Sequence, residues 1–223
     1  MFQEDVLEKI KENPVVVTVV IDDAADAVPL GQALLDGGIK AIELTLRTPV
    51  AMESLSILRK QFPEMTIGAG TVLTREQVRG LKEIDAYFGV APGLNPNVLD
   101  EAQKTGFSFA PGVATPSDIE CALEFGCRIL KFFPAEPIGG LPYLNSMVAP
   151  YRHLGLRFIP LGGVSQSNMR DWLDSPLIAA VGGSWIAPRN LIQAGDWDAI
   201  RQLAAEATET ARKDHLKEEK AFA

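Results

Sequence analysis

The chain has 223 residues, of which 21 are basic and 29 acidic, and its net charge is −8 at pH 7. A length of roughly 200–250 residues is typical of a single α/β barrel. The acidic balance, with basic residues scattered until the end of the chain, argues against a surface for nucleic acid or for an anionic membrane.

Membrane insertion and metal binding are also disfavoured. The longest aliphatic stretch begins at Val15 and is far shorter than the about 20 residues that span a bilayer. The acidic, helix-patterned N-terminus is unlike a signal peptide. Cys121 and Cys127 have no metal-ligand spacing, and so few cysteines indicate reduced thiols. We therefore expect a cytoplasmic protein with no metal and no cofactor.

Short apolar runs rich in Val, Ile and Phe alternate with amphipathic runs along the chain. After a helical pattern at the N-terminus, the predicted strands are residues 15–21, 41–46, 66–72, 86–90, 107–113, 128–135, 157–164 and 178–185. Helix starts are indicated by Pro49, by Thr74 with Gln77, by Pro116 and by Ser165. The strand starts lie roughly 23 residues apart, enough for a strand, a helix and two short loops.

Apolar strands separated by helices predict a parallel sheet covered by helices. Eight such units in this length predict a single α/β domain over residues 1–223, a (β/α)8 TIM barrel with an extra N-terminal helix. A doubly wound open sheet is the alternative. Residues 212–223 form a charged C-terminal tail, which we expect to be a frayed helix end.

Strand alternation predicts which polar side chains face the barrel interior, because residues two apart share a face. In the second strand Glu43 and Arg47 lie on the polar face, opposite the apolar face that meets the helices. In the sixth strand the same alternation places Lys131 and Phe133 inside.

The third strand supplies one further polar group by the same rule. Ile67, Ala69 and Thr71 share a face that we expect to look inward, with Thr71 at the carboxyl end. Glu43, Arg47, Thr71 and Lys131 should then converge in one cavity at the rim where barrel enzymes have their active sites.

Such a cavity holds one acid against two bases. Lys131 could be a structural ion-pair partner of Glu43, but buried charges are costly unless they are paired. The imbalance therefore favours an anionic ligand.

The predicted set suits Schiff-base chemistry. Burial beside another cation lowers the pKa of an amine, and a free amine attacks a carbonyl carbon. Glu43 is the candidate for proton transfer through water, while Arg47 and Thr71 suit a carboxylate. A small-molecule 2-oxo acid would fit, with its carbonyl at Lys131.

Glycine pairs follow the last two predicted strands. The loops at these two positions bind a phosphate in many barrels, because glycine lets backbone N–H groups approach an anion. The alternative is turn geometry that requires a positive φ angle. The candidate phosphate residues are Gly162, Gly163, Gly182, Gly183 and Ser184.

Other sites are disfavoured. The segment GAGTVL at Gly68 lacks the third glycine of a dinucleotide fingerprint. His153 and His215 lie far apart in the sequence, and Ser184 has no histidine base. No metal site or serine nucleophile is therefore expected.

Six motifs occur in order along the chain: ELTLRT from Glu43, GAGTVL from Gly68, PGL from Pro92, KFFPAE from Lys131, GGVS from Gly162 and GGSW from Gly182. From about Asp5 to Ala211 the chain resembles the bacterial aldolases for 2-keto-3-deoxy-6-phosphogluconate (KDPG) and 4-hydroxy-2-oxoglutarate (KHG).

The resemblance implies a class I, metal-independent lyase on a (β/α)8 barrel, assembled as a homotrimer. It implies that Lys131 is the Schiff-base lysine and Glu43 the general acid/base. Arg47 and Thr71 would hold the pyruvate carboxylate, Pro92 and Phe133 would line the pocket, and the glycine pairs with Ser184 would hold the phosphate. The implied reaction releases pyruvate and glyceraldehyde 3-phosphate, in the Entner–Doudoroff route.

Two positions depart from the family pattern. Leu161 stands where threonine is common and Ala91 where serine is common, and each change removes a hydroxyl expected near the aldehyde side of the pocket. A phosphorylated galactonate analogue or an unphosphorylated 4-hydroxy-2-oxo acid is therefore an alternative substrate. By the same resemblance, the enzyme could also cleave KHG to pyruvate and glyoxylate. More distant alternatives are a phosphate-binding barrel isomerase and a non-catalytic protein that binds sugar acids.

Overall fold

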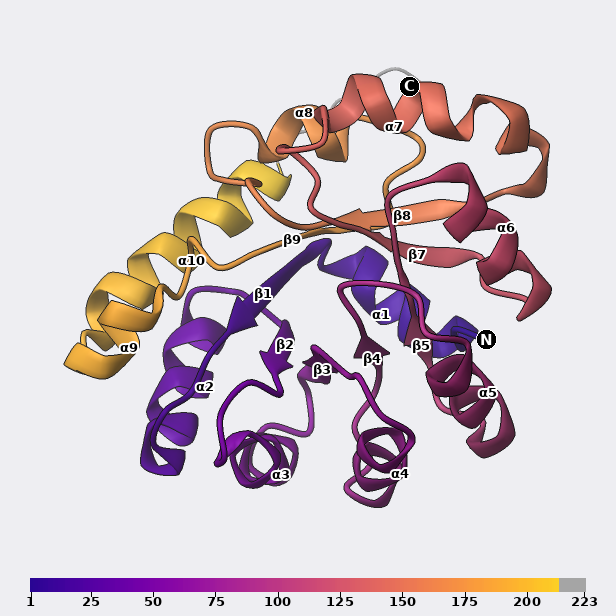
Figure 1. The fold of residues 1–223 in the computed structure, drawn as a ribbon. Helices are drawn as coiled ribbons and strands as arrows, with labels where there is room; N and C mark the ends of the chain where they lie inside the picture. The colour runs from indigo at the N-terminus through magenta and orange to yellow at the C-terminus, as the bar shows by residue number, and fades with distance from the viewer. Residues whose placement is uncertain (213–223) are drawn as a thin grey trace.

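The computed structural model describes residues 1–212, and the strands in this part of the chain pair in parallel. They form a curled sheet with helices around its outside (Figure 1). The strands are β1 (Val15–Val19), β2 (Ala41–Thr45), β3 (Thr66–Gly70), β4 (Gly89–Val90), β5 (Phe109–Ala110), β6 (Gly112–Val113), β7 (Ile129–Phe132), β8 (Arg157–Pro160) and β9 (Val181–Gly183).

The helices lie between these strands. They are α1 (Glu4–Glu12), α2 (Ala27–Asp36), α3 (Ala51–Gln61), α4 (Arg75–Glu83), α5 (Pro96–Thr105), α6 (Pro116–Glu124), α7 (Gly140–Val148), α8 (Met169–Leu173), α9 (Arg189–Ala194) and α10 (Trp197–Arg212), with short 3-10 turns at Ala24–Asp26 and Ala149–Leu154. Among the described residues, no helix combines the length and the apolar character that a bilayer crossing requires.

Hydrogen bonding divides the sheet into two parts, ordered β5-β4-β3-β2-β1-β9 and β6-β7-β8. One division falls within the predicted strand 107–113, which Pro111 interrupts because it has no N–H for the ladder. The other lies between β8 and β9, where Phe158 makes a parallel bridge to Ile178. The predicted strand 178–185 is therefore shorter than expected, and regular pairing with β1 begins at Val181.

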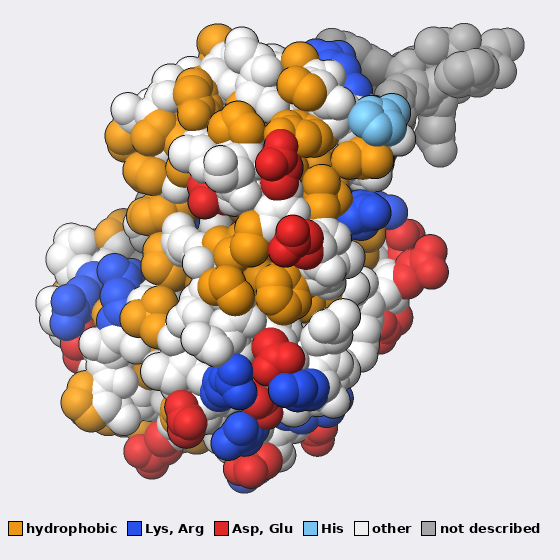
Figure 2. Space-filling view, turned by 45° about the vertical axis from the view of Figure 1, so that its right-hand side comes forward, with side chains coloured by type: hydrophobic (Ala, Val, Ile, Leu, Met, Phe, Trp, Pro, Cys, Tyr) orange, Lys and Arg blue, Asp and Glu red, His pale blue; other side chains and the backbone are white. Residues whose placement is uncertain are grey.

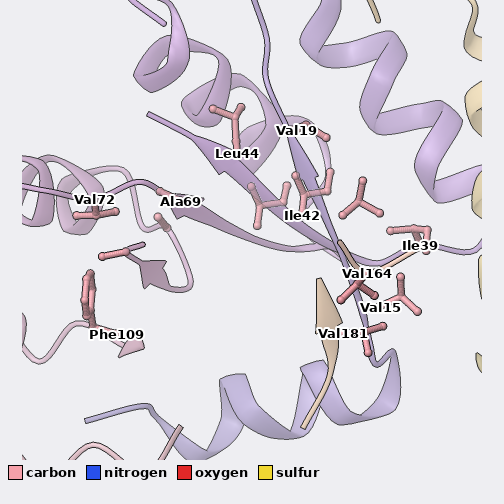
Figure 3. Close-up of a cluster of buried hydrophobic side chains, with 14 of the residues drawn as sticks. Val15, Val19, Ile39, Ile42, Leu44, Ala69, Val72, Phe109, Val164 and Val181 are labelled. Carbon is pink, nitrogen blue, oxygen red and sulfur yellow. The ribbon is translucent and has the colours of Figure 1, made fainter. Parts of the chain in front are cut away.

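The strands bury two different faces. One carries the large helix-facing core, in which Ile42, Leu44 and Ala69 pack together (Figure 3). The other carries a smaller interior cluster that includes Val6 and Ile10 of α1 together with residues from several strands. Figure 1 shows α1 inside the ring of outer helices. Helix α1 therefore fills the amino end of the curled sheet.

Local signals explain some helix starts and miss others. A capping box of Thr74 and Gln77 precedes α4, as predicted, and α6 begins at Pro116 after the Thr115 cap. The start predicted at Pro49 is wrong, because the Thr48 carbonyl and the Ala51 N–H close a turn and α3 begins at Ala51.

The start predicted at Ser165 is also displaced. The Ser165 N–H donates to the Asn168 side chain, so residues 165–168 form a turn and α8 begins at Met169. Nearly all of the predicted charged tail, and His215 within it, lies outside the described residues.

Candidate active site

A cavity of about 190 Å³ opens at the carboxyl ends of the strands. Its wall combines side chains that leave or follow β1, β2, β3, β4, β7, β8 and β9. The lining residues are Thr18, Glu43, Thr45, Arg47, Thr71, Pro92, Lys131, Phe133, Leu161, Gly162, Gly183 and Ser184.

Lys131 and Glu43 form a buried ion pair in this cavity. The Lys131 Nζ donates a hydrogen bond to the Glu43 Oε1 at 2.9 Å, and the two side chains are 6% and 3% exposed. The Nζ also lies 5.7 Å from the centre of the Phe133 ring. Strand alternation predicts both inward positions correctly. The pair is desolvated, and the lysine faces the cavity that a ligand would enter.

Glycine makes room for the glutamate. Gly70 of β3 lies opposite Thr45 of the adjacent strand β2 and faces the interior. A Cβ at Gly70 would overlap the Glu43 carboxylate. Gly68 likewise faces inward, against the ring of Phe88. The absence of a side chain at Gly70 thus leaves the space that the Glu43 carboxylate occupies.

The predicted face of β3 is therefore wrong. Ile67 and Ala69 pack in the helix-facing core, whereas the inward positions are glycines. Thr71 nevertheless lines the cavity, because its φ of 58° breaks the alternation directly after the strand. Few residues with a Cβ adopt this left-handed backbone.

Arg47 is held by a short chain of hydrogen bonds. The Arg47 Nε donates to the Thr45 hydroxyl at 3.1 Å, and that hydroxyl donates to the Val19 carbonyl, also at 3.1 Å. The arrangement fixes the base of the guanidinium and leaves its terminal N–H groups available at the cavity wall, as binding of a carboxylate requires.

The glycine pairs separate into two groups. Gly162, Gly183 and Ser184 line the cavity. A Cβ on Gly163 would instead meet the side chain of Glu136, and one on Gly182 would meet Leu161. Gly162 and Gly163 have φ values of 92° and 86°, so turn geometry requires glycine at both positions whatever they bind.

Two cavity residues, Thr18 and Thr45, are absent from the sequence-predicted set. Thr45 shares the inward face of β2 with Glu43, so alternation already indicated its place. Thr18 is one threonine within the aliphatic run VVVTVVI, and that isolated polar residue was the available signal. Ala91, expected beside the aldehyde, packs in the helix-facing core instead.

Within residues 1–212, no group of three or more His, Cys, Asp or Glu side chains could hold a metal ion. Cys127 is buried, and its burial raises the pKa of the thiol to about 11, which leaves it protonated near neutral pH.

Comparisons with known proteins identify the family of this chain. A model of the family "KDPG and KHG aldolase" matches residues 6–203. The 2-dehydro-3-deoxy-phosphogluconate aldolase of Haemophilus influenzae is 40% identical over 203 residues, which cover 91% of this chain and 95% of that protein.

Two solved structures are similar in fold and in sequence. KDPG aldolase of Legionella pneumophila, with pyruvate captured as a covalent carbinolamine, is 37% identical with a TM-score of 0.86, covering 91% of this chain and 97% of that one. The Zymomonas mobilis KDPG aldolase with 3-phosphoglycerate is 39% identical with a TM-score of 0.84, covering 92% and 95%. This chain belongs to the KDPG and KHG aldolase family.

Proposed function

We propose that this protein is a class I aldolase that cleaves KDPG to pyruvate and glyceraldehyde 3-phosphate through a Schiff base on Lys131. The observation that carries the proposal is the desolvated Lys131 amine, 2.9 Å from the Glu43 carboxylate in a cavity that also contains Arg47. The covalent pyruvate adduct of the Legionella relative supports the same chemistry.

The reaction needs an amine and one proton-carrying group. The Lys131 Nζ gives a proton to Glu43 and attacks C2 of the substrate, which forms a carbinolamine. Glu43 then gives that proton to the carbinolamine hydroxyl, which leaves as water, and a protonated imine remains. Glu43 accepts the proton of the C4 hydroxyl, the C3–C4 bond breaks, and its electron pair moves to the imine nitrogen. The aldehyde departs, Glu43 returns the proton to C3 of the enamine, and water releases pyruvate from the lysine.

Substrate orientation follows from the ends of the cavity. Arg47 and Thr71 hold the carboxylate at the ends of β2 and β3, while Pro92 and Phe133 form walls beside the imine. The phosphate lies at the ends of β8 and β9, held by Gly162, Gly163, Gly182, Gly183 and Ser184. In support, the N–H groups of Gly162, Gly163 and Val164 donate to no other backbone group of residues 1–212.

KHG, cleaved to pyruvate and glyoxylate, is the second candidate substrate. The matched family includes both aldolases, and Leu161 presents an apolar side chain to the cavity. An apolar wall discriminates weakly among hydroxylated aldehydes. A phosphorylated galactonate analogue and unphosphorylated 4-hydroxy-2-oxo acids are alternatives for the same reason.

The proposal includes a closed (β/α)8 barrel with α1 at its amino end. In support, the two hydrogen-bonded groups of strands adjoin at two places, at Pro111 between β5 and β6 and at the bridge from Phe158 to Ile178 between β8 and β9. It also includes a cytoplasmic homotrimer, as the family resemblance implies. Figure 2 shows a face on which hydrophobic side chains gather, as self-association would need.

Trapping with borohydride tests the Schiff base. Incubation with pyruvate and sodium borohydride should reduce the imine to a stable secondary amine, which peptide mass spectrometry would find on Lys131. Lys131→Met should abolish the adduct while the protein stays folded. An isomerase or a non-catalytic binding protein forms no such adduct, so its absence from the folded parent protein would refute the aldolase.

A further inference from the structure

One residue of the cavity wall, Thr18, carries a hydroxyl that the proposed mechanism does not use. Thr18 lies in β1, is 9% exposed and forms part of the cavity wall. Its Oγ1 is buried and makes no hydrogen bond within residues 1–212. The Thr45 hydroxyl in the same wall, by contrast, both donates and accepts.

The unpartnered hydroxyl is unexpected in this position. Val17 and Val19 of β1 face the helices, and Val16, which precedes Thr18 on the inward face, packs in the interior cluster. Valine at position 18 would have the same shape as threonine without a polar atom to desolvate. A buried hydroxyl without a partner is destabilising unless a ligand supplies that partner.

Strand order places Thr18 between the two ends of the cavity. β1 lies between β9 and β2, and Thr18 is in register with Glu43. The proposed carboxylate site follows β2 and β3, and the proposed phosphate site follows β8 and β9. A substrate with C2 on Lys131 and its phosphate toward Ser184 therefore carries C4 past Glu43 and Thr18.

We propose that Thr18 is a further catalytic residue, whose hydroxyl binds the C4 oxygen of the substrate beside Glu43. Because the Oγ1 is buried in the free protein, the proposal includes a rotation about the Cα–Cβ bond to another staggered position, in which the hydroxyl faces the cavity. When Glu43 accepts the O4 proton and the C3–C4 electron pair moves to the imine nitrogen, O4 becomes the aldehyde oxygen. Thr18 donates a hydrogen bond to that oxygen as the bond breaks.

This assignment rests on the proposed aldolase function and is tested by separating two half-reactions. Exchange of the pyruvate methyl protons with deuterium from solvent requires Lys131 and Glu43 but involves no C4 oxygen. Cleavage of KDPG requires all three residues. NMR measures the exchange, and coupled detection of pyruvate measures the cleavage.

Thr18→Val should lower kcat for cleavage about a hundredfold, the low end of the loss seen when one aligned donor is removed. The rate of pyruvate exchange should stay within about twofold of the parent rate, because the substitution leaves Lys131 and Glu43, the two groups that exchange requires, in place. Thr18→Ser should restore cleavage. The Tm of Thr18→Val should not fall, because the hydroxyl has no partner in the free protein.

Ser54→Ala is the matched control, because Ser54 on α3 is also a buried, unpartnered hydroxyl but lies outside the cavity wall. It should leave cleavage unchanged. Cleavage that survives in Thr18→Val, or exchange that falls in parallel with it, would overturn the role of Thr18. A folded parent protein that performs neither reaction refutes the aldolase itself.

Discussion

Lys131 is a buried charged residue whose ion-pair partner, Glu43, also has a role in the proposed chemistry. An isolated ammonium in an apolar interior is strongly disfavoured, so Glu43 stabilises it in the free protein. The same contact places a carboxylate where the proposed proton transfer takes place. Within residues 1–212, the cavity wall has the Glu43 carboxylate against the two cations Lys131 and Arg47, so an anionic substrate improves the charge balance.

Ser184 is the residue at which the choice of substrate can be measured. Ser184→Ala removes a hydroxyl at the proposed phosphate end, and a hydrogen bond to a charged group is often worth about tenfold in affinity. We expect KM for KDPG to rise about tenfold, while KM for unphosphorylated KHG and borohydride trapping of pyruvate stay unchanged. Equal effects on both substrates would contradict a phosphate contact at Ser184.

At the scale of the element, the end of β3 shapes the cavity. Gly70 leaves space for Glu43, and the positive φ of Thr71 turns its side chain inward directly after the strand. The end of β3 thus provides space for the Glu43 carboxylate at Gly70 and a cavity-lining hydroxyl at Thr71.

Gly70→Ala tests this use of space. The added Cβ would overlap the Glu43 carboxylate and displace it from Lys131, so kcat for cleavage should fall at least about tenfold, as small misplacements of a reacting group do. Gly93→Ala is the control, because a Cβ there meets nothing within 4 Å and the φ angle is not left-handed. Steady-state kinetics would measure kcat for cleavage in both variants, and circular dichroism would check that both are folded. Equal activity in the two variants would show that Glu43 adapts.

At the scale of the whole molecule, helix α1 and the candidate active site lie at opposite ends of the curled sheet. Helix α1 fills the amino end of the curled sheet with Val6 and Ile10, whereas the cavity lies at the carboxyl ends of the strands. Stability and activity should therefore respond separately to substitutions at the two ends.

Ile10→Ala tests that separation. Ile10 is fully buried, so its truncation should lower the free energy of unfolding by about 2–5 kcal/mol. The exposed Lys11→Ala on the same helix should change it by no more than about 0.5 kcal/mol. Urea unfolding measures both. The folded Ile10→Ala protein should still form the pyruvate adduct, and loss of the adduct would show that α1 affects the cavity.

Periodicity and motif order predict much of this protein. Alternation correctly places Glu43 and Lys131 inward, because a strand buried on both faces still repeats every two residues. The regular spacing of apolar runs predicts the parallel order of strands and helices. Cap residues such as Thr74 predict helix starts, because their hydrogen bonds are local.

The rest depended on contacts between distant segments. The predicted face of Ile67 and Ala69 was wrong, because Thr71, which was grouped with them, reaches the cavity through its left-handed φ and not through strand alternation. The sequence alone indicated Lys131 and Glu43 as the side chains for the proposed chemistry. Tertiary structure decided that Thr71 reaches the cavity and that the Thr18 hydroxyl has no partner, because a left-handed φ and an unmet hydrogen bond depend on neighbours far away in the chain.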